Sequence, residues 1–271
     1  NMKNEIKELF ENSENLTNKW SNYFNIYEDL FKKYKNKDIT FVEIGIHNGG
    51  SLDIWRKYFT KNTKIIGIDI NPECKKFEKR DENIEVYIGN QSDKNFWDNF
   101  FKKVGPVDII LDDGGHTNLD QIITTINAVK NINDGGILVV EDVHTSYIPE
   151  YNSSLKHSFV NFSKKVINDI NFKNEKDLGD YKFSLNNYIY SIQYFESFTI
   201  FYIDRSKIQK NKPLKNQGVD HNISDLTWIG NEINIQNIKK VLSKIPFIRL
   251  NKLLKYIKNK TNDRLIKKYF D

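Results

Sequence analysis

Short apolar runs alternate with amphipathic stretches through the first half of this chain. Five such runs, each followed by glycine, acidic or polar residues, predict strands at residues 39–44, 64–70, 84–88, 107–111 and 136–140. The apolar positions between them recur every three or four residues, which predicts helices at residues 52–59, 93–103 and 118–130 and after Pro72. Because strands that alternate with helices form parallel sheets covered on both faces, we predict an α/β, Rossmann-like, doubly wound sheet.

The pattern changes after the fifth predicted strand. A loop, a helix and a polar irregular stretch are predicted at residues 145–155, 156–170 and 171–187. Two β-rich runs follow at 188–195 and 198–203, and only Glu196 and Ser197 separate them, which predicts an antiparallel hairpin. The sheet is therefore expected to be mostly parallel, with an antiparallel terminal hairpin.

Both ends of the chain carry helical patterns. Apolar residues from Leu16 to Tyr34 follow helical spacing. After a predicted linker, short amphipathic helices are predicted at residues 232–245, 247–259 and 262–270. We therefore divide the chain into N-terminal helices, a sheet domain and a helical C-terminal extension, at residues 1–37, 38–204 and 205–271.

Composition narrows the class of protein. Hydrophobic residues make up 38% of the 271 residues and charged residues 28%, with a mean hydropathy of −0.63. No stretch approaches the roughly 18 consecutive apolar residues of a membrane-spanning helix, so we expect no stable membrane insertion. Cys74 is the single cysteine, which excludes a disulfide within the chain and a cysteine-based zinc cluster. Together with a polar N-terminal stretch, this predicts a reducing, cytoplasmic setting.

The positive charge is concentrated at the C-terminal end. Residues 205–271 carry 16 Lys or Arg and five Asp or Glu, whereas the chain as a whole has a net charge of +5. Such an extension suits nucleic acid, an anionic membrane surface or another subunit. Lysine is abundant throughout, and the extension lacks the interleaved aromatic residues of a single-strand binding surface. We therefore expect no nucleic-acid partner, and we expect the extension to pack on the body or in a homo-oligomer.

The residues that follow each strand are the candidate site, because ligands bind at the carboxyl ends of the strands in open α/β sheets. The first turn is rich in glycine and leads into a helix, which lets the backbone approach a ligand. An acidic side chain follows the second strand, where it can accept the hydroxyls of a ribose. In the third turn, Ser92 or Asp93 also suits a helix N-cap. The candidate cofactor contacts are Glu43, Gly45, Asn48, Gly49, Ser51, Asp69, Gln91, Ser92, Asp93 and Asp112.

The fourth and fifth turns carry the most reactive groups. The sequence is DDGGH at residues 112–116 and EDVH at residues 141–144. Clustered carboxylates repel one another unless a cation lies between them, and oxygen ligands suit Mg²⁺ or Mn²⁺. We therefore predict Asp113, Glu141 and Asp142 as metal ligands. His116 lies beside them and is the candidate to take a proton from a hydroxyl, while His144 is a candidate to orient a substrate.

These motifs resemble a known family. The runs FVEIGIHNGGS at 41–51, IGID at 66–69, LDDGGH at 111–116 and VEDVHTSY at 140–147 are similar to class I S-adenosylmethionine (SAM)-dependent methyltransferases. More narrowly, they resemble the metal-dependent sugar O-methyltransferases of the macrocin and mycinamicin type, and related enzymes that act on nucleotide-linked sugars such as capsular heptoses. The resemblance covers about residues 39–147, with a looser match to 203.

The resemblance implies a function and roles for the residues. Asp113, Glu141 and Asp142 match magnesium ligands, and His116 matches the general base. The turn from Gly45 to Ser51 matches the part that binds the methionine of SAM, Asp69 the ribose-binding acid, and residues 91–93 the adenine-contacting turn. The implied reaction is methyl transfer to a hydroxyl of a sugar, such as a nucleotide-linked sugar of capsule polysaccharide or natural-product biosynthesis. His144 and Tyr147 are the candidate acceptor contacts.

Two other enzyme classes stay open at this stage. An NAD-dependent oxidoreductase on a similar sheet explains the glycine turn and Asp69 but not the two carboxylate clusters. A metal-dependent O-methyltransferase of a catechol-like small molecule explains the same residues with a different acceptor.

Overall fold

The computed structural model describes residues 4–151, 154–171, 185–208, 214–219 and 221. The chain separates into two units, residues 1–210 and 211–271. Nearly all of the second unit lies outside the described residues. This includes the three short helices predicted at residues 232–270 and most of the positively charged residues of the extension. The predicted boundaries between the N-terminal helices, the sheet domain and the C-terminal extension, after residues 37 and 204, stay a prediction. Within the described part, no helix is both long enough and apolar enough to span a bilayer.

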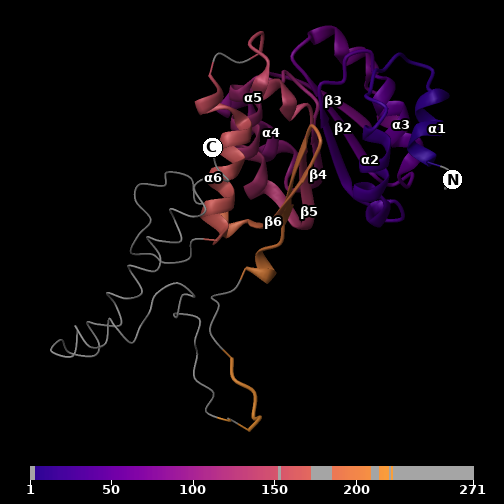
Figure 1. Cartoon of the computed structure of the whole chain (residues 1–271). Helices are drawn as coiled ribbons and strands as arrows, with labels where there is room; N and C mark the ends of the chain where they lie inside the picture. Colours follow the sequence, from indigo (N-terminus) through magenta and orange to yellow (C-terminus); the bar gives the residue numbers. More distant parts are fainter. Residues whose placement is uncertain (1–3, 152–153, 172–184, 209–213, 220, 222–271) are drawn as a thin grey trace. The chain divides into compact units, whose positions relative to one another are not determined.

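A seven-stranded sheet forms the centre of the first unit (Figure 1). Its strands run in the order β3-β2-β1-β4-β5-β7-β6. The first five pair in parallel, and β7 pairs antiparallel with both β5 and β6. The predicted fold class, a mostly parallel Rossmann-like sheet with an antiparallel terminal hairpin, is confirmed. The strands are β1 (Thr40–Ile44), β2 (Lys64–Asp69), β3 (Ile84–Ile88), β4 (Val107–Asp112), β5 (Ile132–Val140), β6 (Ile189–Phe195) and β7 (Phe198–Ile203).

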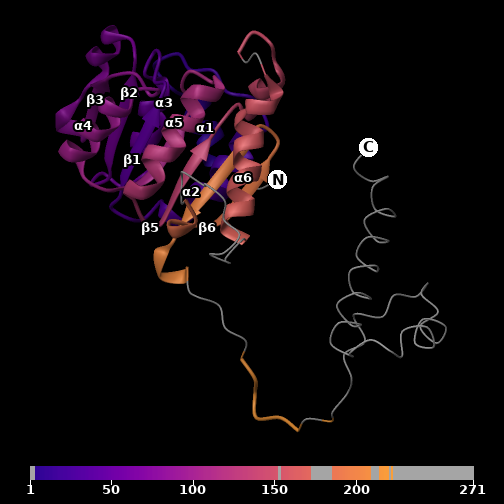
Figure 2. The same cartoon turned by 90° about the vertical axis from the view of Figure 1, so that its left-hand side faces the viewer.

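Helices cover both faces of this sheet. Helices α1, α2 and α3 pack on one face and α4, α5 and α6 on the other (Figure 1). On the second face, α5 and α6 lie beside each other (Figure 2). The helices are α1 (Glu5–Glu11), α2 (Tyr23–Phe31), α3 (Gly50–Tyr58), α4 (Lys94–Val104), α5 (Asn118–Ala128) and α6 (Phe159–Asn171).

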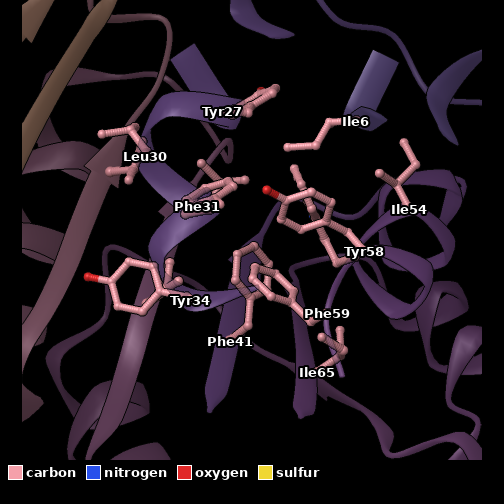
Figure 3. Close-up of a cluster of buried hydrophobic side chains, with 14 of the residues drawn as sticks. Ile6, Tyr27, Leu30, Phe31, Tyr34, Phe41, Ile54, Tyr58, Phe59 and Ile65 are labelled. Carbon is pink, nitrogen blue, oxygen red and sulfur yellow. The ribbon is translucent and has the colours of Figure 1, made fainter. Parts of the chain in front are cut away.

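The apolar runs of the strands supply two cores, one on each face. In β1, Phe41 points to the α2 and α3 side, whereas its neighbour Val42 belongs to the cluster beneath α4 and α5. Neighbouring residues alternate in this way because successive side chains of a strand point to opposite faces of the sheet. On the first face, the fully buried ring of Phe31 packs between Phe41, Trp55 and Phe59, with ring centroids 5.4–6.2 Å apart (Figure 3).

The helix predicted to begin near Leu16 begins at Tyr23, so the prediction was wrong for residues 16–22. This part of the chain is rich in Asn, Ser and Thr, which favour turns because their side chains compete for backbone hydrogen bonds. Contacts with distant parts of the chain hold residues 12–22, which we call the N-terminal strap. Asn15 donates to Asp53 of α3 at 2.7 Å, for example. Leu16 and Trp20 are 64% and 61% exposed, and the strap lies outside the helices.

Smaller differences occur at turns. The helix predicted after Pro72 is a 3₁₀ helix, Pro72–Phe77. Strand β5 begins four residues before the predicted start, where its register with β4 shifts between Val107 and Ile109. Two short 3₁₀ helices, Val143–Tyr147 and Leu155–His157, overlap the ends of the predicted loop at 145–155, and the helix predicted from residue 156 begins at Phe159.

Replacing Phe31 by Ala tests the first core. Its ring is fully buried among other rings, so the cavity left behind should lower the free energy of unfolding by about 3–5 kcal/mol. Leu119→Ala is the control, because Leu119 is 60% exposed and its loss should change stability by less than about 0.5 kcal/mol. Urea unfolding followed by circular dichroism measures both. Equal effects of the two substitutions would contradict this assignment of the core.

Candidate active site

A cleft of about 780 Å³ runs along the carboxyl ends of the parallel strands. It is formed by the turns after β1 to β5 together with the N-terminal strap. Its volume falls in the range of ligand pockets, about 300–1,000 Å³. Of the predicted site residues, those that line it are Gly45, Ser51, Asp69, Gln91, Asp113, His116, Glu141 and Asp142.

The glycine turn after β1 is held against the turn after β4. Gly45 has a φ of +85°, and a Cβ at this position would lie 2.1 Å from the carbonyl oxygen of Asp113. No residue with a side chain fits such an approach. Gly49, with a φ of +75°, is the N-cap residue that precedes helix α3. Gly49 and Asn48 lie outside the lining of the cleft.

Glu43 and Ser51 form a pair beneath this turn. The Ser51 hydroxyl donates to Glu43 at 2.6 Å, and the Glu43 side chain is fully buried. Burial raises the pKa of Glu43 to about 7. Glu43 therefore supports the floor of the cleft rather than lining it.

Asp69, at the end of β2, organises the same turn from the other side. One carboxylate oxygen accepts hydrogen bonds from the backbone N–H groups of Ile46 and His47, both at 3.0 Å. The other oxygen accepts from the N–H of Asn71 at 2.9 Å. Oδ1 accepts only one of these bonds and so keeps acceptor capacity; because Asp69 lines the cleft, this oxygen can still accept from a hydroxyl of a ligand.

Gln91 links the third and fourth turns. Its amide nitrogen donates to Asp112 at 2.9 Å and to Thr124 at 3.1 Å, and its carbonyl accepts from the N–H of Gly115 at 2.8 Å. The neighbouring residue Asp93 is the N-cap of α4, where it accepts from the N–H of Asn95 at 2.8 Å. This is the capping role that the sequence left open.

Ser92 and Asp112 also lie outside the lining of the cleft. The Ser92 hydroxyl donates to Asn90 at 2.8 Å. Asp112 is buried, accepts from Gln91 and from the N–H of Gly114, and has one oxygen without a hydrogen-bond partner within the described residues. Burial raises the pKa of Asp112 to about 7.

Asp113, His116 and Asp142 meet where β4 and β5 end. One ligand atom from each of the three lies within 4.8 Å of the others, as the binding of one metal ion requires. The Nε2 atom of His116 is 4.0 Å from Oδ1 of Asp113 and 3.6 Å from Oδ2 of Asp142. The backbone of His116 is fixed by the Thr145 hydroxyl, which donates to its carbonyl at 2.8 Å.

The third predicted ligand, Glu141, has other partners. Its carboxylate is fully buried, and it accepts hydrogen bonds from the Tyr27 hydroxyl and, at 3.2 Å, from Lys19. The Lys19 ammonium also donates to Asp113 at 2.5 Å and lies 3.9 Å from Glu43. Although burial alone lowers it, the carboxylates of Asp113 and Glu141 raise the pKa of Lys19 well above its usual value.

Three residues of this cluster were not assigned to the site from the sequence. Lys19 is one of many lysines, and no spacing in the sequence singles it out. Tyr23 and Tyr27 were assigned to the apolar face of a helix, which they also form, but their hydroxyls donate to Asp142 and Glu141. A tyrosine on a buried helix face needs a partner for its hydroxyl, and this requirement is the one signal that the sequence offered.

A second hollow, of about 460 Å³, lies on the other side of Trp20 and Tyr23. Both predicted acceptor contacts, His144 and Tyr147, line it, and the Tyr147 side chain is 60% exposed. Nδ1 of His144 is 3.8 Å from Asp142, which places this hollow next to the acidic cluster.

Solved structures share this arrangement of strands. The MycE methyltransferase from the mycinamycin biosynthetic pathway, solved in complex with Mg and SAH, superimposes with a TM-score of 0.65 at 22% sequence identity. The match covers 74% of this chain and 54% of that one. The fold is therefore that of a methyltransferase.

The chain belongs to the FtsJ-like methyltransferase family, whose sequence model matches residues 27–212. This membership confirms the methyltransferase resemblance that the motifs indicated. It also decides against the NAD-dependent oxidoreductase that the glycine turn and Asp69 had left open.

Curated relatives narrow the resemblance further. The chain is 29% identical over 166 residues to 8-demethyl-8-alpha-L-rhamnosyl tetracenomycin-C 2'-O-methyltransferase of Streptomyces olivaceus. It is 32% identical over 147 residues to demethylmacrocin O-methyltransferase of Streptomyces fradiae, and 32% identical over 132 residues to mycinamicin VI 2''-O-methyltransferase of Micromonospora griseorubida. These matches cover 57%, 50% and 46% of this chain. They cover only 43%, 36% and 32% of the relatives, so the chain spans less than half the length of each.

The buried carboxyl group of Asp112 predicts a pH dependence of stability. Its pKa in the folded state, about 7, lies above that of an unfolded aspartate, so folding favours the protonated form. Stability that is present below about pH 4 should therefore be lost as the pH rises through 7. Asp112→Asn, which mimics the protonated form, should gain about 1–3 kcal/mol relative to wild type between pH 4 and pH 8.

Chemical denaturation across this pH range measures the difference. Asp98→Asn is the control, because the Asp98 side chain is 52% exposed on α4 and should not alter the profile. Parallel profiles of wild type and Asp112→Asn would contradict the protonation of Asp112 in the folded state.

Proposed function

We propose that this protein is a SAM-dependent, divalent-metal-dependent O-methyltransferase that transfers a methyl group to a hydroxyl of a sugar. The observation that carries this proposal is the convergence of Asp113, His116 and Asp142 at one end of the cleft. The turn after β4 contributes Asp113 and His116 both to the lining of the cleft and to this cluster. The proposed sites of the methyl donor and the metal ion are therefore adjacent.

The residues of the cleft fit SAM. A cleft of this volume accommodates a nucleoside with an amino-acid extension, and Asp69 lies where a ribose is held in such folds. Gly45, Ile46 and His47 line the cleft, and the missing side chain of Gly45 allows close approach of the amino-acid part. SAM supplies a methyl group already activated on a positively charged sulfur.

The donor set at the other end fits Mg²⁺ or Mn²⁺. Carboxylates of Asp113 and Asp142 are hard oxygen ligands, and these ions prefer them. Glu141 stays the proposed third ligand, although Lys19 and Tyr27 hold its carboxylate in this structure. When bound, the ion supplies positive charge that favours the deprotonated form of a hydroxyl.

His116 is the proposed general base. Its Nε2 atom faces the carboxylates of Asp113 and Asp142, which stabilise the imidazolium that forms when the ring takes a proton. Its Nδ1 is buried and makes no hydrogen bond within the described residues, so Nε2 is the nitrogen proposed to take the proton. The Thr145 hydroxyl holds the backbone of His116 and thereby keeps the ring at the cluster.

The second hollow is the proposed acceptor site. Aromatic side chains of Trp20, Tyr147 and Tyr194 line it, and aromatic faces pack well on the apolar faces of sugar rings. The name of the tetracenomycin relative specifies a rhamnosyl compound as its substrate, which supports a sugar as the acceptor. We propose a nucleotide-linked sugar of capsule polysaccharide or natural-product biosynthesis. A homo-oligomer and a cytoplasmic location are part of the same proposal.

A methyl-transfer assay tests the reaction. Labelled SAM, Mg²⁺ and a panel of nucleotide sugars, glycosides and catechols should give product with a sugar and none in EDTA. Asp113→Asn and His116→Ala should each lower kcat about 10²- to 10⁴-fold, the usual contribution of a positioned acid or base. His157→Ala is the control, because His157 is exposed in the 3₁₀ helix Leu155–His157 and should retain full activity.

Two results would count against the proposal. Full activity in EDTA, or in both Asp113→Asn and His116→Ala, would contradict the metal-assisted mechanism. Methylation of catechols alone would replace the sugar by a catechol-like acceptor while leaving the rest of the mechanism in place.

Tyr147→Ala tests the acceptor site. Tyr147 lines the second hollow but not the cleft, so its loss should raise KM for the acceptor about three- to tenfold, the size of a typical aromatic contact, without changing SAM affinity. Tyr190→Ala is the control, because it removes a ring of comparable exposure from β6, outside the hollow. It should change neither KM for the acceptor nor the affinity for SAM. An unchanged KM for the acceptor in Tyr147→Ala would show that the acceptor binds outside this hollow.

A further inference from the structure

We propose that Lys19 is a built-in cation that competes with the divalent metal ion for the carboxylates of Asp113 and Glu141. The inference rests on the proposed function, because it concerns the same acidic cluster. It adds a residue of the N-terminal strap as the determinant of how tightly that cluster binds its metal.

The carboxylate oxygens divide into two sets. Oδ2 of Asp113 and Oε2 of Glu141 receive the Lys19 ammonium at 2.5 and 3.2 Å, and Oε1 of Glu43 lies 3.9 Å from it. Oδ1 of Asp113 and Oδ2 of Asp142 face His116 instead. Asp113 therefore binds Lys19 with one carboxylate oxygen. Its other oxygen faces His116 and the carboxylate of Asp142, and this is where we propose the metal ion.

Both carboxylate oxygens of Glu141 already have partners while Lys19 stays in place, so a metal ion has to share them or displace the lysine. One of its oxygens accepts from Tyr27 and the other from Lys19, and the carboxylate is fully buried. An ion bound between Asp113 and Asp142 is also a neighbour of the ammonium, and like charges at this range repel strongly where solvent is excluded. The Lys19 side chain is only 4% exposed, so water screens the repulsion little.

The strap is built so that the ammonium can withdraw. Lys19 lies between α1 and α2, outside both helices, while Asn15 binds α3 and Tyr23 starts α2. The neighbours Leu16 and Trp20 are largely exposed and line the cleft. Withdrawal of Lys19 therefore needs no unfolding of a helix, and it changes the wall of the cleft.

Metal binding to the full chain tests the proposal without an activity assay. Mn²⁺ binding is followed by EPR, and Mg²⁺ is added as the competitor. Lys19→Met should bind Mn²⁺ at least about tenfold more tightly than wild type, which corresponds to about 1.4 kcal/mol. Lys19→Arg keeps the charge and should bind like wild type. Lys7→Met is the control for net charge, because Lys7 is on the surface, 3.8 Å from Glu11, and its loss should leave affinity unchanged.

A stability measurement guards against misfolding of the variant. Lys19→Met leaves Glu43 and Glu141 buried without a cation, so its melting temperature should fall without metal and rise on adding Mg²⁺ by more than that of wild type. Lys19→Gln, which keeps a hydrogen-bond donor but no charge, should follow Lys19→Met. Hydrogen exchange at residues 12–22 should quicken when wild type binds Mg²⁺.

The outcomes separate this inference from the proposed function. Equal or weaker Mn²⁺ binding by folded Lys19→Met and Lys19→Gln, with wild type still binding Mn²⁺ through Asp113, would overturn the role of Lys19 alone. Unchanged exchange of the strap on metal binding would overturn the withdrawal of Lys19. Failure of every variant and of wild type to bind Mn²⁺ would overturn both the metal site and the competition for it.

Discussion

The crowding of negative charge at the ends of β4 and β5 is the constraint on which the rest of the site depends. Glu43, Asp113, Glu141 and Asp142 approach one another in a region from which solvent is largely excluded. Buried carboxylates are stable only when cations or hydrogen-bond donors compensate them. In this structure a lysine ammonium and two tyrosine hydroxyls provide part of that compensation. The negative charge that these groups leave uncompensated is the reason why we propose a metal ion at this cluster.

The sheet produces this crowding through its order of strands. Strands β1, β4 and β5 are parallel neighbours, so their carboxyl ends come to the same edge and carry Glu43, Asp113 and Glu141 there together. The two cores on the faces of the sheet fix the strands, and side-chain hydrogen bonds such as those of Gln91 then tie neighbouring turns to one another. The chemistry is therefore positioned by packing far below the cleft.

The sequence predicted those parts of the molecule that local pattern determines. The strands at 84–88 and 198–203 have the predicted bounds, because buried strands are short apolar runs that end at polar or glycine turns. The sequence also predicted that Asp113 and Asp142 cluster, because each follows a strand of the same parallel sheet. The position of Lys19 could not be predicted, since its partner Asp113 lies 94 residues away and the strap between α1 and α2 is held by tertiary contacts rather than by periodicity.

The contact between Gly45 and the backbone of Asp113 has a consequence for how the two ends of the cleft behave. Main chain meets main chain there without an intervening side chain, so no rotamer change can absorb a shift of either turn. A shift of one turn toward the other therefore has to be met by a main-chain movement of its neighbour. We expect binding at one end of the cleft to influence binding at the other, and thermodynamic reciprocity then makes the two influences equal.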